Sequence, residues 1–128
     1  MTKRDIKPTE KELEILRVMW GKEAVSVKEV HEFLGGDKTN GYTTVLKLMQ
    51  IMYEKGLVTR QKSGKLHLYR AASTMESTQK QVVNRLINTV FQGSAAQLVI
   101  SALGNKTSSP EELKEIRQYL EKLEGGEQ

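Results

Sequence analysis

The sequence predicts a mainly α-helical fold in two parts, with one short β-hairpin between them. Three observations predict it. Several segments begin with serine or threonine and carry glutamate three residues later, which is an N-terminal helix signature. Apolar residues in these segments recur at spacings of three and four, as they do on one face of a helix. Residues 58–70 instead read as two short strands around a Ser-Gly pair, which is typical of a hairpin.

Composition limits the class of protein. The chain has 128 residues, which suits one domain or a small domain with an extension. Only 5% of residues are aromatic, so the core must be aliphatic, and the absence of cysteine excludes disulfides and thiolate metal sites. The N-terminus lacks the apolar stretch of a secretory signal, and the longest nearly apolar run, 95–103, is far shorter than the roughly 20 residues of a membrane span. We therefore expect a soluble, cytoplasmic protein.

The first two helices are predicted from their caps and glycines. The box Thr9–Glu12 begins the first helix, which Gly21 ends. The box Ser26–Glu29 begins the second, a short helix that ends at 35–36. The residues expected to face inward are Leu13, Leu16 and Trp20 in the first helix and Val27, Val30, Phe33 and Leu34 in the second.

A third helix is predicted over residues 41–55, and Gly56 ends it. Its expected inward stripe is Tyr42, Val45, Leu46, Met49, Met52 and Tyr53. In the hairpin that follows, a two-residue turn at 63–64 would place Lys62 directly opposite Lys65, an unfavourable pairing of like charges. Three helices followed by a two-stranded ribbon predict a winged helix-turn-helix domain over residues 1–72, in which the ribbon is the wing.

Residues 73–128 are predicted to form a helical dimerisation domain. A helix ending at Gly93, a helix beginning after Ser94, and a helix beginning after Ser109 follow one another. The last of these carries apolar residues at the spacing of a coiled-coil seam, namely Leu113, Ile116, Leu120 and Leu123. Such stripes need a partner, and a second copy is the simplest one. The alternative is that these helices fold back on the winged domain.

Charge is unevenly distributed along the chain. Residues 1–75 hold 14 Lys and Arg against 9 Asp and Glu, whereas residues 76–128 hold 6 against 7. Between residues 38 and 70, seven cations accompany a single acid, Glu54. This asymmetry favours a polyanionic partner for the N-terminal half, although a solvated basic surface is the plainer alternative.

The third helix and the wing offer the groups that bind double-stranded DNA. Hydroxyl, ammonium and amide groups on the exposed helix face can contact base edges, and wing cations can neutralise phosphates. The alternatives are an ordinary solvated helix face and basic residues that protect an exposed strand edge from aggregation. The candidate DNA-binding residues are Asn40, Thr43, Thr44, Lys47, Gln50, Arg60, Lys62 and Lys65.

Motifs for catalysis or metal binding are missing from the sequence. His31 and His67 are far apart, and no metal-ligand spacing, phosphate loop or nucleophile elbow occurs. We therefore expect no enzyme activity, no cofactor and no metal, and no small-molecule ligand is evident. From these residues the functions that remain open are a protein that binds DNA and blocks a promoter, an activator or replication protein that binds DNA without blocking one, and a winged-helix module that binds protein without specific DNA binding.

Four stretches carry a resemblance to a known family: "PTEKELEILRVMWG", "SVKEVHEFL", "GYTTVLKLMQIMYEKGLV" and "GKLHLYRA". Together they resemble the penicillinase and methicillin-resistance repressors, the BlaI/MecI family. The resemblance runs from about Thr9 to Leu123. It implies a homodimeric winged-helix repressor that binds a palindromic operator, with Thr43, Thr44 and Lys47 on the recognition face and Lys62 and Lys65 on the wing. The dimer seam it implies comprises Val90, Leu98, Val99 and Leu103.

The resemblance also implies how repression is relieved. Members of the family are relieved by proteolysis in the penultimate helix, which a membrane-bound sensor metallopeptidase sets in motion. The aligned position here is Ser101-Ala102, where the antibiotic-resistance repressors carry asparagine and an aromatic residue. Copper-responsive members use C-terminal cysteines, which this chain lacks, so metal sensing is not expected.

Overall fold

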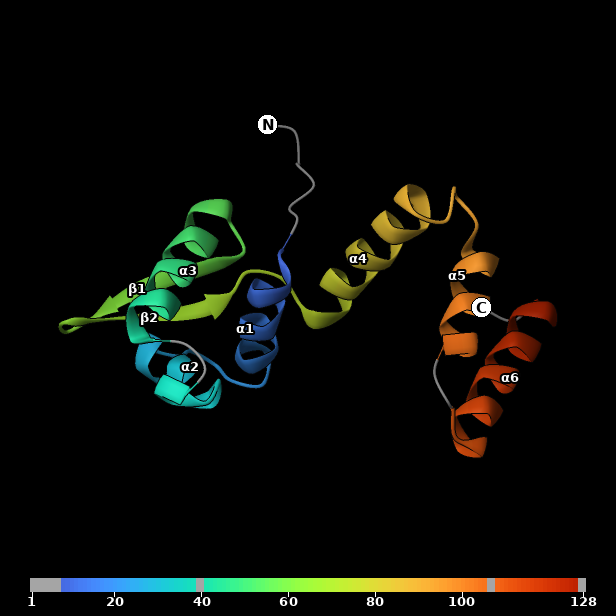
Figure 1. The fold of residues 1–128 in the computed structure, drawn as a ribbon, viewed down its shortest axis with the longest axis horizontal. Coiled ribbons are helices and arrows are strands. Elements are labelled where there is room, and N and C mark those ends of the chain that lie inside the picture. The colour runs from blue at the N-terminus through green and yellow to red at the C-terminus, as the bar shows by residue number, and fades with distance from the viewer. Residues whose placement is uncertain (1–7, 39–40, 106–107, 127–128) are drawn as a thin grey trace. The chain divides into compact units, whose positions relative to one another are not determined.

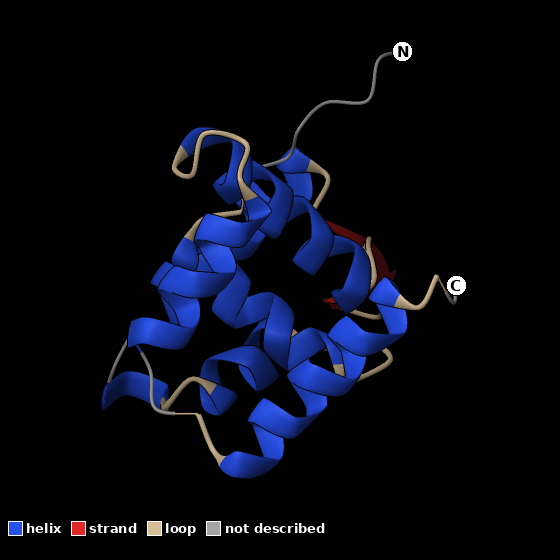
Figure 2. Cartoon of the chain, turned by 90° about the vertical axis from the view of Figure 1, so that its right-hand side faces the viewer, coloured by secondary structure: helices blue, strands red, loops and turns tan. Residues whose placement is uncertain are grey.

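The computed structural model describes residues 8–38, 41–105 and 108–126, and it confirms the mainly helical fold (Figure 1). The two strands of the hairpin are coloured red and the helices blue in Figure 2. In chain order, the elements are α1 (Glu10–Trp20), α2 (Val27–Phe33), the 3₁₀ turn η1 (Gly36–Lys38), α3 (Tyr42–Lys55), β1 (Val58–Ser63), β2 (Leu66–Ala71), α4 (Met75–Thr89), α5 (Ala95–Asn105) and α6 (Pro110–Glu124).

The predicted helix caps are confirmed. At the start of α1 the Glu12 amide donates to the Thr9 hydroxyl at 3.2 Å, and the Thr9 amide donates to the Glu12 carboxylate at 2.9 Å. Equivalent reciprocal bonds begin α2 at Ser26 and α6 at Ser109. Each box provides hydrogen-bond acceptors for amide groups that have no acceptor within the helix. These sequences therefore fix where the helices start.

The core of residues 1–82 lies among α1, α2, α3 and the base of the hairpin. Val25, between α1 and α2, adds a short bridge to β2: its amide donates to the Tyr69 carbonyl at 2.9 Å, and the Tyr69 amide donates to the Val25 carbonyl at 2.7 Å. The wing is thereby fastened to the helices at its base. The buried apolar residues are Ile15, Leu16, Met19, Val25, Val27, Val30, Val45, Met49, Met52, Val58 and Tyr69.

The expected hairpin turn was wrong by one residue. The strands are antiparallel with Ser63 opposite Leu66 and Lys62 opposite His67, so the turn residues are Gly64 and Lys65. Gly64 has φ +65°, which glycine adopts without steric cost at the first position of a tight hairpin turn. Lys62 and Lys65 therefore do not face each other across the ladder.

Three aromatic residues expected inside are exposed. Phe33 is 58% exposed, with the Lys22 ammonium 4.3 Å from its ring centroid. Tyr42 and Tyr53, at the two ends of α3, are 45% and 40% exposed. These rings lie at the margins of the apolar stripe, where residue spacing alone does not decide between core and surface.

Residues 83–128 form a second compact unit, distinct from residues 1–82. The predicted domain boundary after residue 72 lies just before α4 and stays a prediction. In this unit several large apolar side chains are uncovered, including Ile100 at 63%, Leu120 at 50% and Leu123 at 53% exposure. Within the described parts of the chain, no helix is long and apolar enough to cross a membrane.

Candidate nucleic-acid interface

The candidate interface begins with the outer face of α3. Thr43, Thr44, Lys47 and Gln50 are all exposed there, opposite the buried stripe. Gly41 precedes the helix and has no side chain, so it offers no hydrogen-bond acceptor to the amides of the first turn. Free amides at a helix start favour an approaching phosphate. Asn40, also predicted for this surface, lies outside the described residues.

The start of α3 is held by a buried histidine of α2. The His31 ring meets the Tyr42 ring edge-on, with centroids 5.9 Å apart, and its Nε2 lies 3.2 Å from the Asp37 carboxylate. This histidine therefore connects α2, the 3₁₀ turn and the first residue of α3. His31 thus has a packing role at the start of α3.

The end of α3 is held by an ion pair with α1. The Lys55 ammonium lies 2.7 Å from the Glu12 carboxylate, which is only 3% exposed and also closes the cap of α1. Gly56 then takes φ 86° and ends the helix, with its amide donating to the Tyr53 carbonyl at 3.1 Å. With both ends fixed, α3 presents its exposed face in one orientation.

The wing carries cations at its tip and structural arginines nearer its base. Lys62 and Lys65 are exposed. The guanidinium carbon of Arg60 lies 4.0 Å from the centroid of the Tyr53 ring, and Arg70 Nη1 donates to the Glu23 carbonyl at 3.2 Å. The structure thus separates the predicted wing cations into two freely projecting lysines and an arginine that stacks on α3.

Sequence reasoning missed Tyr42 and Tyr53 as members of this surface. Both fit the helical apolar spacing, which predicts a place in the core. A signal for Tyr53 was available, since Arg60 shares a strand face with Val58, whose side chain is buried. The alternation therefore turns Arg60 toward the helices.

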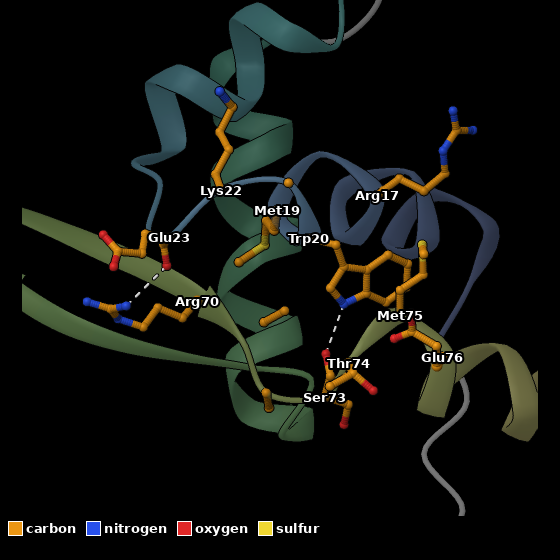
Figure 3. Close-up of a pocket in the computed structure, with 13 residues that line it drawn as sticks. Arg17, Met19, Trp20, Lys22, Glu23, Arg70, Ser73, Thr74, Met75 and Glu76 are labelled. Carbon is orange, nitrogen blue, oxygen red and sulfur yellow. Dashed lines mark hydrogen bonds between the residues drawn. The ribbon is translucent and has the colours of Figure 1, made fainter.

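A depression beside α1 has a different character. It lies where the end of α1, the loop after it, the end of β2 and the start of α4 meet, all within residues 17–76. Figure 3 shows the Trp20 indole turned toward the segment that precedes α4, where Nε1 donates to the Ser73 carbonyl at 2.9 Å. The Arg70–Glu23 bond lies in the same region. These two bonds join the segment before α4 to the end of α1, and β2 to the loop after α1.

Chemically, the arrangement offers hydrogen-bonding groups and cations on one surface. The described residues contain no group of three or more His, Asp or Glu side chains able to hold a metal ion. What the surface offers is hydroxyl, amide and ammonium groups on a fixed helix beside a basic ribbon. These are the groups that contact base edges and phosphates in a duplex.

Comparison with known proteins gives consistent matches. The family model described as penicillinase repressor matches residues 8–122. The methicillin resistance regulatory protein MecI of Staphylococcus aureus (strain N315) is 25% identical over 111 residues, which are 87% of this chain and 90% of that protein. The penicillinase repressor of Bacillus licheniformis is 27% identical over 111 residues, or 86% of each chain.

One solved structure is similar in fold. The solution structure of the DNA binding domain of the repressor BlaI aligns with a TM-score of 0.51 and 22% identity. It covers 58% of this chain and 90% of that domain. The likeness confirms the predicted winged-helix fold.

Proposed function

The chain belongs to the penicillinase repressor family, and from that premise we propose that it is a homodimeric repressor that occupies a palindromic operator. Its family consists of transcriptional repressors and not of enzymes, so the chain is a DNA-binding transcriptional regulator. The dimer, the operator symmetry and the mode of relief are our proposals. A repressor needs access to the chromosome, so we also place the chain in the cytoplasm.

One observation supports this function above the others. The exposed face of α3 and the whole hairpin contain a single carboxylate, Glu54, although the chain as a whole has 16 acidic residues. A surface that only needed to be soluble would mix both signs of charge. Because phosphates repel carboxylates and attract ammonium groups, a surface with this bias suits a duplex. A module that binds other proteins has no such reason to keep carboxylates this scarce on both elements.

The mechanism we propose is steric. Each protomer places the outer face of α3 in a major groove, which is wide enough for a helix, while the wing contacts the adjacent backbone. The two-fold axis of a dimer then separates the half-sites by one helical turn of DNA, about 34–36 Å, or by a multiple of it. A dimer bound in this way excludes other proteins from the promoter.

We propose that cleavage in α5 relieves repression, under the control of a membrane-bound sensor metallopeptidase. The Ser101–Ala102 bond lies inside α5, where Ser101 is partly buried and Ala102 is exposed. A peptide bond within a helix must unwind before it can enter an extended protease site, so opening of α5 would precede the cut. Mass spectrometry of the protein from induced cells tests this, and an intact α5 during full induction would contradict it.

The overall proposal is tested by incubating the purified dimer with genomic fragments and sequencing those retained. We expect enrichment of a small set of promoter fragments that share an inverted repeat. Recovery of fragments in proportion to their abundance would contradict operator recognition while leaving non-specific DNA binding in place.

Replacing Lys47 with alanine is expected to weaken binding to the enriched fragment by about 1–3 kcal/mol and to affect a random duplex much less. Lys47 is exposed in the middle of the outer face of α3, where its ammonium can reach the guanine acceptors. Competition titrations on both duplexes measure the difference. An equal loss on both would remove Lys47 from base reading.

Replacing Lys65 with alanine is expected to weaken binding to both duplexes alike. Lys65 lies in the hairpin turn, at the tip of the wing. Because we propose that the wing contacts the DNA backbone, we expect Lys65 to contact a phosphate and not a base. Loss of one phosphate contact in each protomer should lower the slope of log K against log salt by about 0.9 per half-site. A loss confined to the enriched fragment would assign Lys65 to base contact.

A further inference from the structure

The contact between Tyr53 and Arg60 joins the two elements of the interface. Tyr53 belongs to the last turn of α3, and Arg60 is in β1, on the strand face that also carries Lys62. The guanidinium carbon lies 4.0 Å from the ring centroid, well within the range of a cation–π contact. Arg60 is partly buried, while the ring of Tyr53 is 40% exposed, so the pair lies at the surface where helix and wing meet.

The stack occupies only the flat face of the guanidinium. Within residues 8–38, 41–105 and 108–126, the structure gives the Arg60 guanidinium no hydrogen bond and no ion pair, not even with Glu54, which follows Tyr53 in α3. Its five N–H donors lie in the plane of the group, at right angles to the stacking contact. A guanidinium held in this way can donate two parallel bonds to phosphate without leaving the ring.

We infer that Tyr53 is a positioning residue that holds Arg60 as a preformed phosphate clamp between the recognition helix and the wing. The inference rests on the proposed DNA binding and adds a specific device to it. Free arginine side chains lose rotational freedom when they bind, and that loss weakens binding. Here the tyrosine ring has already restricted the arginine, so contact with the backbone requires less ordering.

Four variants test this: Tyr53→Phe, Tyr53→Leu, Arg60→Ala and the double variant Tyr53→Leu/Arg60→Ala. Binding to a short fluorescent random-sequence duplex is measured by anisotropy over a series of sodium chloride concentrations. Tyr53→Phe keeps the ring face and should bind as the wild type does. Tyr53→Leu removes the stack and should weaken binding by about two- to tenfold per half-site, the range expected for one unrestricted side chain.

The decisive readout is the coupling between the two positions. Arg60→Ala should weaken binding and lower the salt slope by about 0.9 per half-site. The double variant should bind no worse than Arg60→Ala, because Tyr53 acts only through the arginine. A purely structural tyrosine would instead weaken binding equally whether residue 60 is arginine or has been changed to alanine. Thermal unfolding of each variant without DNA shows whether the fold has been lost.

Three results would overturn the inference: additive losses in the double variant, an unchanged salt slope in Arg60→Ala, or a Tyr53→Phe variant as weak as Tyr53→Leu. Each of these leaves DNA binding by the wild-type protein intact, so the proposed function would survive. If the wild-type protein itself retained no duplex at low salt, both the proposed function and this inference would fail.

Discussion

Replacing Leu120 with aspartate is expected to convert the dimer to monomers and to weaken operator binding by at least about a hundredfold. The loss is large because two linked half-sites gain about 10²–10⁴ in affinity over one, and a monomer forfeits that gain. Leu120 is 50% exposed in the described chain, in the middle of the apolar stripe of α6. A carboxylate there would have to be buried against apolar side chains of the partner subunit.

The physical argument for this seam is the amount of uncovered apolar surface. Burying one leucine or isoleucine side chain contributes about 1.5–3 kcal/mol, and the second unit leaves several such side chains exposed. Single exposed apolar residues need no explanation, but a row at three- and four-residue spacing does. The residues we propose for the dimer interface are Val90, Leu98, Val99, Leu103, Leu113, Ile116 and Leu120; of these, Leu98 and Ile116 are already partly buried within the chain.

Gln118→Asp is the matched control, since it adds the same charge two residues away on the opposite side of α6. Sedimentation should show a dimer for this control and monomers for Leu120→Asp, with similar helical circular dichroism for both. An intact dimer in Leu120→Asp would exclude this face of α6 from the seam.

The helices of the wing domain were predictable from local chemistry. Capping boxes at Thr9 and Ser26 and the stop at Gly56 depend on residues only three or four positions apart, which a sequence displays directly. The hairpin register follows from the backbone conformation of the turn and not from strand alternation alone. A turn at Ser63–Gly64 would force Ser63 into a positive φ in either favoured type, I′ or II′, whereas a type II′ turn at Gly64–Lys65 requires a positive φ only of glycine.

The residues of the candidate interface were likewise only partly predictable from the sequence. The exposed positions of α3 follow from helical spacing once the apolar stripe is known, and Thr43, Thr44, Lys47 and Gln50 are indeed on the surface. The stacking of Arg60 on Tyr53 depends on how two elements pack together, and so does the burial of His31. Whether a side chain at the margin of an apolar stripe is buried or exposed depends on the neighbouring element. The position of that element cannot be read from helical spacing.

Raising sodium chloride from about 50 to 200 mM is expected to weaken duplex binding by about a thousandfold to a hundred-thousandfold, the range for proteins that make about 6–10 phosphate contacts. A dimer in which each protomer neutralises about three phosphates falls at the lower end of it. On each protomer the cations that we propose for this are Arg60, Lys62 and Lys65. The effect is large because every neutralised phosphate releases condensed counterions into the solution, and added salt opposes that release.

A pair of triple variants distinguishes placed charge from net charge. Lys47, Lys62 and Lys65 are changed to glutamine in one protein, and Lys80, Lys114 and Lys122 in the other, so both lose the same charge from a chain of net charge +4. All six lysines are exposed. If the duplex lies on α3 and the wing, the first variant loses most of the salt slope and the second keeps it, because screening at physiological salt confines each charge to about 8 Å. Equal slopes in the two variants would mean that the chain attracts DNA only through its overall charge, and the interface proposed on α3 and the wing would be wrong.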